Sequence, residues 1–391
     1  MNILLACQQS PVAYPIPAYG FWRHYFVRGL EEAGHEVHEV PAADWARGLL
    51  PLSAEERAGW AAETWQRTLD HARRLRASGR LDLFLGYLYP TQIDVPAVRA
   101  LRDLGVPCVN FFCDNVREYA RLPREFAPFD LHWVPELAAL PLYSARGWPA
   151  LHAPMPCWVP PERRRPPWSE RQVVSFIGGR DPLRAALLAQ VAVATPGLPL
   201  EIRGPGWIPS APRRQAAPPP PTSLRARMSD WTGLIRRQGL AAAARRLVSR
   251  FQSPQDLSFD FSPVLQPSPD DDTYAALLSG AAVSLGINRF PSFRFPAARP
   301  GVYSRLRDIE APMLGACYLA EHAPELEVFY EPGLEIETYR DAPELVEKAR
   351  SLLADAPRRA RLRAAGQARA LAHHGIGSTL DRIAKRFDLR S

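Results

Sequence analysis

Short apolar runs alternate with amphipathic stretches along the first third of the chain. Trp22, Phe26, Leu30 and Ala33 recur at helical spacing, and Gly34, a residue typical of helix C-termini, follows them. Near-continuous apolar strands that alternate with helices favour a parallel sheet covered on both faces. The predicted strands of this part are residues 3–6, 35–40, 81–86, 107–113 and 131–134.

The same alternation begins again after a segment rich in proline and arginine, residues 157–169, which we interpret as a linker. Two successive α/β halves predict an α/β protein with two Rossmann-like domains that face a central cleft. We expect an N-terminal domain over 1–160 and a C-terminal domain over 170–372. The second half is predicted to contain strands at 173–177, 198–203, 281–287 and 313–320, and helices at 182–194, 344–355, 358–373 and 378–387.

The composition is that of an ordinary globular protein. Apolar residues make up 47% and charged residues 23%, which excludes a disordered, fibrous or coiled-coil chain. No run approaches the roughly 18 apolar residues of a membrane span, and the first residues do not have the pattern of a signal peptide. Five cysteines are scattered without the spacing of metal ligands, so we expect inert thiols in a reduced, cytoplasmic protein.

The formal net charge of +7 is concentrated in one segment. Residues 208–256 contain nine arginines and two aspartates, so the rest of the chain is neutral and specific binding of nucleic acid is not expected. Apolar residues at helical spacing within 224–251 predict two amphipathic helices with their arginines outward. This pair either packs on its own domain or, as the alternative, makes peripheral contact with an anionic membrane surface or an acidic acceptor.

Two groups of residues in the second half are candidates for binding a nucleotide. Gly178, Gly179 and Arg180 follow the predicted strand 173–177, and Arg184 lies in the next helix. Glycines let the backbone approach a phosphate, a helix N-terminus attracts anions, and guanidinium groups neutralise a diphosphate. Glu310 begins a predicted helix, and its two carboxylate oxygens match the two hydroxyls of a ribose; the alternative is a carboxylate that stabilises its own helix.

Three further acidic or basic features have a structural alternative. Asp270–Asp272 precede a predicted helix, and helix capping is favoured there over a metal site. Asp114 follows a buried strand at the end where α/β sheets bind ligands, or it caps a loop. His24 lies on the first helix, opposite the apolar face, and is either a base on the acceptor side or a histidine that faces solvent.

The chain resembles the CgeB-like (spore-maturation-protein-like) branch of the GT-B glycosyltransferases. The resemblance is good over 173–206 and 270–387, loose over 1–159, and absent from the basic segment. It rests on Cys113–Asn115, Phe176–Gly178, Arg184, Gly204–Trp207, Arg307, Glu310, Gly315, Phe329, Gly333, Glu335, Tyr339, Glu344, Leu345, Gly366, His374 and Arg382.

The resemblance implies a GT-B fold, with a nucleotide-sugar donor in the C-terminal domain and the acceptor facing the N-terminal domain. The C-terminal helix, 373–391, would cross back to the first domain, and neither a metal ion nor another cofactor would be required. In the related retaining enzymes, two glutamates eight positions apart flank the donor. Only the second is present here, as Glu310, because the first position is Val302.

We therefore expect a glycosyltransferase (a hexosyl- or similar transferase) that moves a sugar from a nucleotide-diphosphate donor to an unidentified acceptor. The alternative is a catalytically silent GT-B-like nucleotide-binding or scaffold protein. Asp114 and His24 are the predicted catalytic residues, and no metal ligands are expected. The predicted donor-binding residues are Gly178, Gly179, Arg180, Arg184, Asn288, Arg307 and Glu310.

Overall fold

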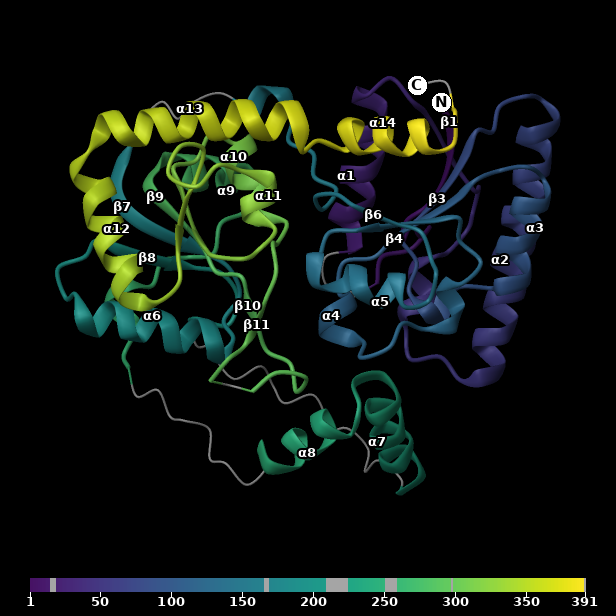
Figure 1. The fold of residues 1–391 in the computed structure, drawn as a ribbon, viewed down its shortest axis with the longest axis horizontal. Coiled ribbons are helices and arrows are strands. Elements are labelled where there is room, and N and C mark those ends of the chain that lie inside the picture. The colour runs from purple at the N-terminus through teal and green to yellow at the C-terminus, as the bar shows by residue number, and fades with distance from the viewer. Residues whose placement is uncertain (15–18, 165–168, 209–223, 250–258, 297, 390–391) are drawn as a thin grey trace. The chain divides into compact units, whose positions relative to one another are not determined.

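The computed structural model describes residues 1–391 except 15–18, 165–168, 209–223, 250–258, 297 and 390–391. The chain divides into two units, each with its own parallel sheet (Figure 1). Unit 1 comprises Met1–Val116, Leu122–Trp158 and Ala372–Ser391, and unit 2 comprises Arg117–Arg121 and Val159–Leu371. None of the helices in the described ranges is both long enough and apolar enough to cross a membrane.

Unit 1 contains a six-stranded sheet in the order β2-β1-β3-β4-β5-β6, with every neighbouring pair parallel. The central strands are almost wholly buried, as the continuous apolar runs predict. The sixth strand was not predicted, because its three residues are only half-buried and do not form an apolar run. The strands are β1 (Asn2–Ala6), β2 (Glu36–Glu39), β3 (Leu83–Gly86), β4 (Cys108–Phe111), β5 (Leu131–Val134) and β6 (Ala150–His152).

The longest helix of unit 1, α2 (Ala54–Ala77), begins at a capping box. Glu56 N donates to Ser53 Oγ (3.2 Å), and Ser53 N donates to the Glu56 carboxylate (2.8 Å). Trp60 and Trp65 of this helix pack edge-on against Trp45 in the core. The other helices are α1 (Tyr19–Glu32), α3 (Val95–Asp103), α4 (Asn115–Glu118, which continues into unit 2), α5 (Leu140–Ser144) and α14 (Ile376–Arg386).

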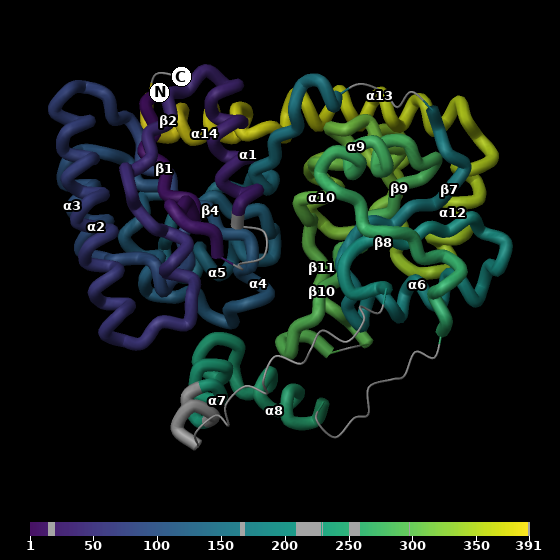
Figure 2. The backbone as a smooth tube through the Cα atoms, turned by 180° about the vertical axis from the view of Figure 1, so that it is seen from behind, coloured from purple at the N-terminus to yellow at the C-terminus, as the bar shows by residue number. Residues whose placement is uncertain are grey.

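The C-terminal helix α14 belongs to unit 1, where it lies along α1 (Figure 2). The two helices approach closely at Gly29, because a Cβ atom there would lie only 2.5 Å from Ile376 Cδ1. Ile376, Leu380 and Ile383 are buried in this contact region. The last helix therefore contributes to the core of the unit that contains the N-terminus.

Unit 2 contains a five-stranded parallel sheet in the order β13-β12-β9-β7-β8. Helices α6 (Pro182–Ala194) and α12 (Ala342–Ala354) pack together and cover one face of it with leucine and valine side chains. The strands are β7 (Arg171–Ile177), β8 (Leu200–Arg203), β9 (Ala281–Gly286), β12 (Tyr318–Glu321) and β13 (Glu337–Tyr339), and β10 (Arg289–Phe290) and β11 (Gly301–Val302) form a separate antiparallel pair.

The predicted helices 182–194, 344–355 and 358–373 are present to within two residues of their predicted bounds, whereas the short helix α11 (Leu326–Phe329) was not predicted. The predicted strand 313–320 is wrong at its start, because α10 continues to Met313 and the strand begins at Tyr318. The apolar residues in between form the helix end and a turn at Gly315 (φ +72°). The helices are α6 (Pro182–Ala194), α7 (Leu224–Gln238), α8 (Leu240–Ser249), α9 (Asp271–Gly280), α10 (Arg307–Met313), α11 (Leu326–Phe329), α12 (Ala342–Ala354) and α13 (Ala356–His373).

The basic segment contains the two helices α7 and α8, and its residues 209–223 and 250–256 lie outside the described part of the chain. The chain leaves the sheet after β8 and returns beside the same strand. Leu265 forms a parallel bridge with Ile202, and Gln266 N donates to Ile202 O (2.9 Å). The ring of Phe261 also packs edge-on against Trp207, with centroids 5.2 Å apart. The part of the chain that carries the basic segment thus leaves and rejoins unit 2 at one place.

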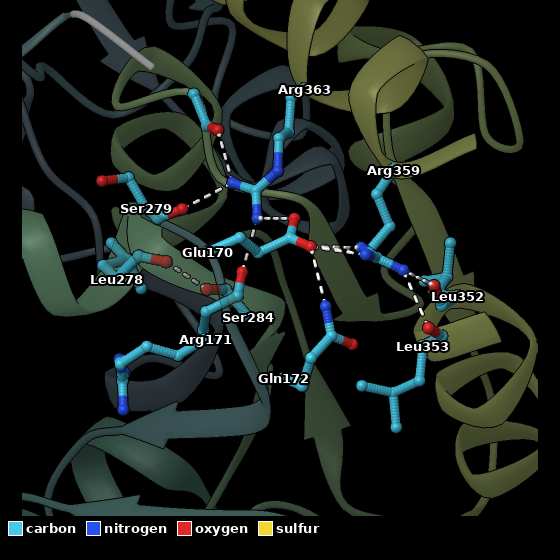
Figure 3. Close-up of polar contacts among 12 residues, drawn as sticks. Glu170, Arg171, Gln172, Leu278, Ser279, Ser284, Leu352, Leu353, Arg359 and Arg363 are labelled. Atoms are coloured by element: carbon cyan, nitrogen blue, oxygen red, sulfur yellow. Dashed lines mark hydrogen bonds and ion pairs between the residues drawn. The ribbon is translucent and has the colours of Figure 1, made fainter. Parts of the chain in front are cut away.

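An ion-pair network ties α13 to the sheet of unit 2 (Figure 3). The Glu170 carboxylate accepts hydrogen bonds from Arg359 and from Arg363 Nη2 (3.1 Å). Arg359 also donates to the carbonyl oxygens of Leu352 (2.6 Å) and Leu353 (2.9 Å), at the end of α12. Arg359 is 2% exposed, so this guanidinium depends on protein partners for its hydrogen bonds.

Candidate functional site

The topology of the unit 2 sheet defines one place where a ligand is expected. β7 lies between β8 and β9, so the chain moves to one side of β7 and then to the other. Open α/β sheets bind ligands at such a switch point, outside the carboxyl ends of the strands. Here these ends lead into Gly178 after β7 and into Asn288 shortly after β9.

The turn after β7 is interlocked with the turn after β8. Gly178 N donates to Arg203 O (2.9 Å), and Arg180 N donates to Pro205 O (3.0 Å). Trp207 Nε1 donates to Gly178 O (2.7 Å), and the guanidinium of Arg180 lies 5.9 Å from the centroid of the Trp207 ring. The two turns therefore form one rigid unit at the edge of the sheet.

Gly204 makes this close approach feasible. Its φ is +128°, and a Cβ atom there would lie 2.4 Å from Gly178 O. A side chain at this position would displace the turn that holds Gly178.

The N-terminus of α6 is already capped from within the protein. The Asp181 carboxylate accepts from Leu183 N and from Arg184 N, each at 2.9 Å. Asp181 therefore uses two of the helix amides that an anion at this helix N-terminus would otherwise contact. In the described part of the chain, the Gly179 amide makes no hydrogen bond, so it remains available to a ligand.

Several arginines converge on this edge. Arg184 Nη1 donates to Gly179 O (2.9 Å), and its Nε lies 3.2 Å from Asp181 Oδ2. Burial lowers the pKa of Arg184, and the positive charges of neighbouring arginines lower it further: Arg305, Arg307 and Arg117. A guanidinium stays protonated in proteins, so the lowered pKa means that its charge is held at a cost. A bound anion would relieve this repulsion.

Arg307 and Glu310 lie on one side of α10 and reach the same edge. Arg307 Nη1 donates to Ile177 O (2.7 Å), at the last residue of β7. Its guanidinium lies 5.1 Å from the centroid of the Tyr274 ring, and its Nε lies 3.7 Å from Glu310 Oε2. Glu310 is 8% exposed and accepts a hydrogen bond from Tyr274 Oη (2.5 Å). The carboxylate thus has partners on α9 and on its own helix.

Asn288 has a different environment from the other predicted donor-binding residues. Its Nδ2 donates to Asp308 Oδ2 (3.0 Å) and to Glu321 O (2.8 Å), and Asn288 is 1% exposed. Both amide hydrogens are therefore used inside the protein. These contacts hold the carboxyl ends of β9 and β12 and the start of α10 together. Asn288 therefore positions these ends relative to one another.

Asp308 is a buried acid that the sequence analysis did not single out. It accepts from Arg305 N (2.9 Å) and from Tyr318 Oη (2.7 Å), as well as from Asn288. Burial raises the pKa of Asp308 to about 6. Tyr274 was also not singled out. Asp308 lies 20 positions from Asn288, and Tyr274 lies 36 positions from Glu310, and no sequence motif relates the two members of either pair.

In unit 1, the acidic turn at Asp114 is held by a buried carboxyl group. Asn115 donates to Glu136 Oε2 from its backbone N (3.0 Å) and from Nδ2 (2.7 Å). Tyr143 Oη donates to Asn115 Oδ1 (2.8 Å). Burial raises the pKa of Glu136 to about 8, although the contacts from Asn115 oppose this, and the nearby charge of Asp114 adds to it.

His24, the other predicted catalytic residue, is exposed on α1. Its ring packs edge-on against Trp158, with centroids 5.2 Å apart. Burial and the charges of Arg28 and Arg23 lower its pKa. His24 and Asp114 thus lie on different elements of unit 1, and their catalytic roles stay predictions.

The aspartate run acts as a helix cap. Asp270 Oδ1 accepts from Thr273 N (2.9 Å) at the start of α9, as the capping interpretation predicts. Among the residues that the structure describes, no group of three or more His, Cys, Asp or Glu side chains is arranged to hold a metal ion. The five cysteines are all buried.

The two units and their parallel sheets make up the GT-B fold. Sucrose-phosphate synthase from Thermosynechococcus elongatus is similar to this chain with a TM-score of 0.53 and 15% identity, over 99% of this chain and 98% of that protein. HepE from Anabaena, in complex with UDP, gives a TM-score of 0.53 and 11% identity over 99% and 100%. AviGT4, a glycosyltransferase involved in avilamycin A biosynthesis, gives 0.51 and 17% over 99% and 96%.

At the level of sequence, residues 263–385 match a family model described as "Glycosyl transferase-like". This segment contains Asn288, Arg307, Asp308 and Glu310, and it ends within α14. No curated protein sequence matches the chain.

Proposed function

We propose that the protein is a glycosyltransferase of the CgeB-like branch, which takes a sugar from a nucleotide-diphosphate donor bound to unit 2. The observation that carries the proposal is the convergence of Arg184, Arg307 and Glu310 at the switch point between β7 and β9. The family match over 263–385 supports it, and so does the binding of UDP and UDP-glucose by HepE.

Each group has a distinct role in this proposal. The Gly179 amide, Arg184 and Arg307 bind the diphosphate, and Glu310 accepts hydrogen bonds from the ribose hydroxyls. When the bond between the sugar and the diphosphate breaks, the electron pair leaves with the diphosphate. Arginines beside it stabilise this growing charge more in the transition state than in the ground state. We expect them to do so without a metal ion, so a chelator should leave donor binding unchanged.

The acceptor side is proposed to lie in unit 1. Asp114 follows β4 at the carboxyl edge of that sheet and is the leading candidate for the base that removes the acceptor proton. His24 is the second candidate.

A catalytically silent nucleotide-binding or scaffold protein is the second candidate function. Val302, at the position of the missing glutamate, lies in β11 and pairs with Arg289 in β10. An aliphatic residue there cannot make the polar contact to the sugar that a glutamate makes. Arg307 is our candidate for supplying it.

The proposal is tested with a panel of nucleoside diphosphates and their sugars. UDP, GDP, ADP and CDP are each added at millimolar concentration, and the melting temperature is measured. A ligand at 100 times its Kd stabilises the folded state by about 2.7 kcal/mol, so binding should raise the melting temperature by several degrees. If none of the four nucleotides raises the melting temperature, both candidate functions are contradicted. A shift without hydrolysis or transfer of any donor sugar, including with lysates as a source of acceptors, favours the silent protein.

A further inference from the structure

Unit 2 contains an apolar cavity beside the carboxyl ends of β7 and β9, where the donor is proposed to bind and which we call the donor edge. The cavity has a volume of about 650 Å³, within the roughly 300–1,000 Å³ of small-molecule sites. Its walls come from the first residues of α6, one side of α8 and the loop between β10 and β11. Leu183, Ala244, Val248, Phe290 and Phe295 are among the residues that line it. A cavity with this lining favours a hydrocarbon or aromatic group over a sugar.

The cavity adjoins an exposed apolar surface on the basic segment. Val248 lines the cavity and is 52% exposed, and Leu247 beside it is 49% exposed. Leu240, earlier on α8, is 73% exposed, and Phe293 in the loop is 39% exposed. A group of exposed apolar side chains next to an apolar cavity is typical of a surface that contacts lipid or another apolar partner.

Two arginines line the cavity, and the charge of one of them acts on Arg184. Arg117 and Arg245 line the cavity, together with one acidic residue, Glu118, whose carboxylate lies 3.9 Å from Arg117 Nε. Arg245 Nη1 donates to the carbonyl oxygens of Phe293 (3.0 Å) and Arg294 (2.7 Å), which fixes the loop to α8. The charge of Arg117 also acts on Arg184, directly after Leu183 in the chain. Arg117 therefore supplies positive charge to the cavity near Arg184, and Glu118 offsets part of it.

We propose that this cavity binds the hydrocarbon chain of a phosphate-bearing lipid, with the phosphate toward Arg117 and the donor edge. The apolar lining takes the chain, and the arginines complement the negative charge. With the donor bound as in the proposed function, the phosphate of this lipid is held close to the sugar donor. Binding of the chain itself does not depend on that function.

Titration calorimetry with alkyl phosphates tests whether the cavity binds a hydrocarbon chain that carries a phosphate. The ligands have six, eight and ten carbons, and each is used below its critical micelle concentration. Each added methylene buries apolar area, so affinity should rise about fourfold per methylene until the cavity is full. Inorganic phosphate should bind at least a hundredfold more weakly than decyl phosphate. Decyl maltoside, which has the chain without the charge, should bind at least tenfold more weakly. Affinity independent of chain length, or equal affinity for decyl maltoside, overturns the proposal.

Two tryptophan variants on α8 place the site. Ala244 lines the cavity, whereas Ala241, one turn earlier and also exposed, does not. Ala244→Trp should lower the affinity for decyl phosphate at least tenfold, and Ala241→Trp should leave it within twofold. Equal effects of the two variants contradict binding in the cavity. UDP binding is measured on the same samples: its absence with decyl phosphate binding intact contradicts the proposed function alone.

Discussion

Glu310 illustrates how one carboxylate can serve both stability and binding. A residue in the first turn of a helix contributes little to stability when it faces water, but Glu310 is buried and accepts from Tyr274 Oη. We predict that Glu310→Ala lowers nucleotide affinity about ten- to hundredfold, because two charge-assisted hydrogen bonds to the ribose are lost. The same change should cost about 1–3 kcal/mol of stability, because the Tyr274 hydroxyl loses its acceptor.

Tyr274→Phe separates these two effects. It removes the same internal hydrogen bond but keeps the carboxylate, so nucleotide affinity should stay within about threefold of wild type. Calorimetry with UDP, and with its 2′-deoxy analogue as a control, measures the difference. Equal affinity of wild type and Glu310→Ala for UDP would show that Glu310 does not contact the ribose.

Gly204 is predicted to be intolerant of any side chain. Its positive φ and its contact with Gly178 O make Gly204→Ala strained both in its backbone and in its packing. We expect a loss of about 2–4 kcal/mol in urea unfolding, together with weaker nucleotide binding. Gly197→Ala is the control, since a Cβ atom there would meet nothing within 4 Å and its φ is not positive. A loss no larger than that of the control would mean that the two turns are not interlocked.

Glu136 should make stability depend on pH. Its folded-state pKa of about 8 lies above the roughly 4.3 of an unfolded glutamate, so the folded protein binds the proton more tightly between these values. The stabilising contribution is full below pH 4 and is lost as the pH rises through 8. Glu136→Gln should flatten this part of the profile. Urea unfolding at each pH tests this, and parallel profiles for the two proteins would contradict it.

At the scale of elements, the network around Glu170 secures α13 against the sheet of unit 2. Glu170→Ala would leave the buried guanidinium of Arg359 without its carboxylate. Because the Glu170 side chain is 28% exposed, we expect a loss of about 2–3 kcal/mol, below the full cost of breaking a buried pair. Glu63→Ala, which breaks a surface pair with Arg67, should cost less than about 0.5 kcal/mol. Similar losses for both variants in urea unfolding would rule out a special role for Glu170.

The sequence predicts elements well where one physical signal dominates. The helix 182–194 was predicted with its observed bounds, because proline begins it and apolar residues continue through it. α2 was missed, although Ser53 and Glu56 form a readable capping box, because its buried face mixes tryptophan with threonine and alanine. The strand at 313–320 was placed too early because an apolar run does not distinguish a buried helix end from a strand.

The candidate site was predictable only in part, for a related reason. Gly178, Arg184 and Glu310 belong to local patterns, so the sequence indicates the chemistry of an anion and a ribose. Tyr274 and Asp308 gain their importance from partners on other elements, and the capping role of Asp181 competes with the helix dipole that the pattern favoured. Such contacts depend on tertiary packing, which periodicity does not report.

At the scale of the whole molecule, each unit has its own core, and α14 belongs to the core of unit 1. Leu380→Ala, at a fully buried position of α14, should destabilise unit 1 by about 2–4 kcal/mol. UDP binding to unit 2 should remain within about twofold of wild type. Hydrogen exchange resolved by segment tests this: faster exchange in both units alike would show that they unfold as one.

The contact between Trp207 and Phe261 has a consequence for how this protein diverges from its relatives. The basic segment leaves and rejoins unit 2 at one point beside the edge strand β8, so its length and content impose little on the pairing of the strands. In evolution, the basic segment can be lost, lengthened or exchanged while Arg184, Arg307 and Glu310 keep their positions. Lipid binding and donor chemistry are then inherited as separable traits, the first changing by replacement of a whole segment and the second by slow substitution at the sheet.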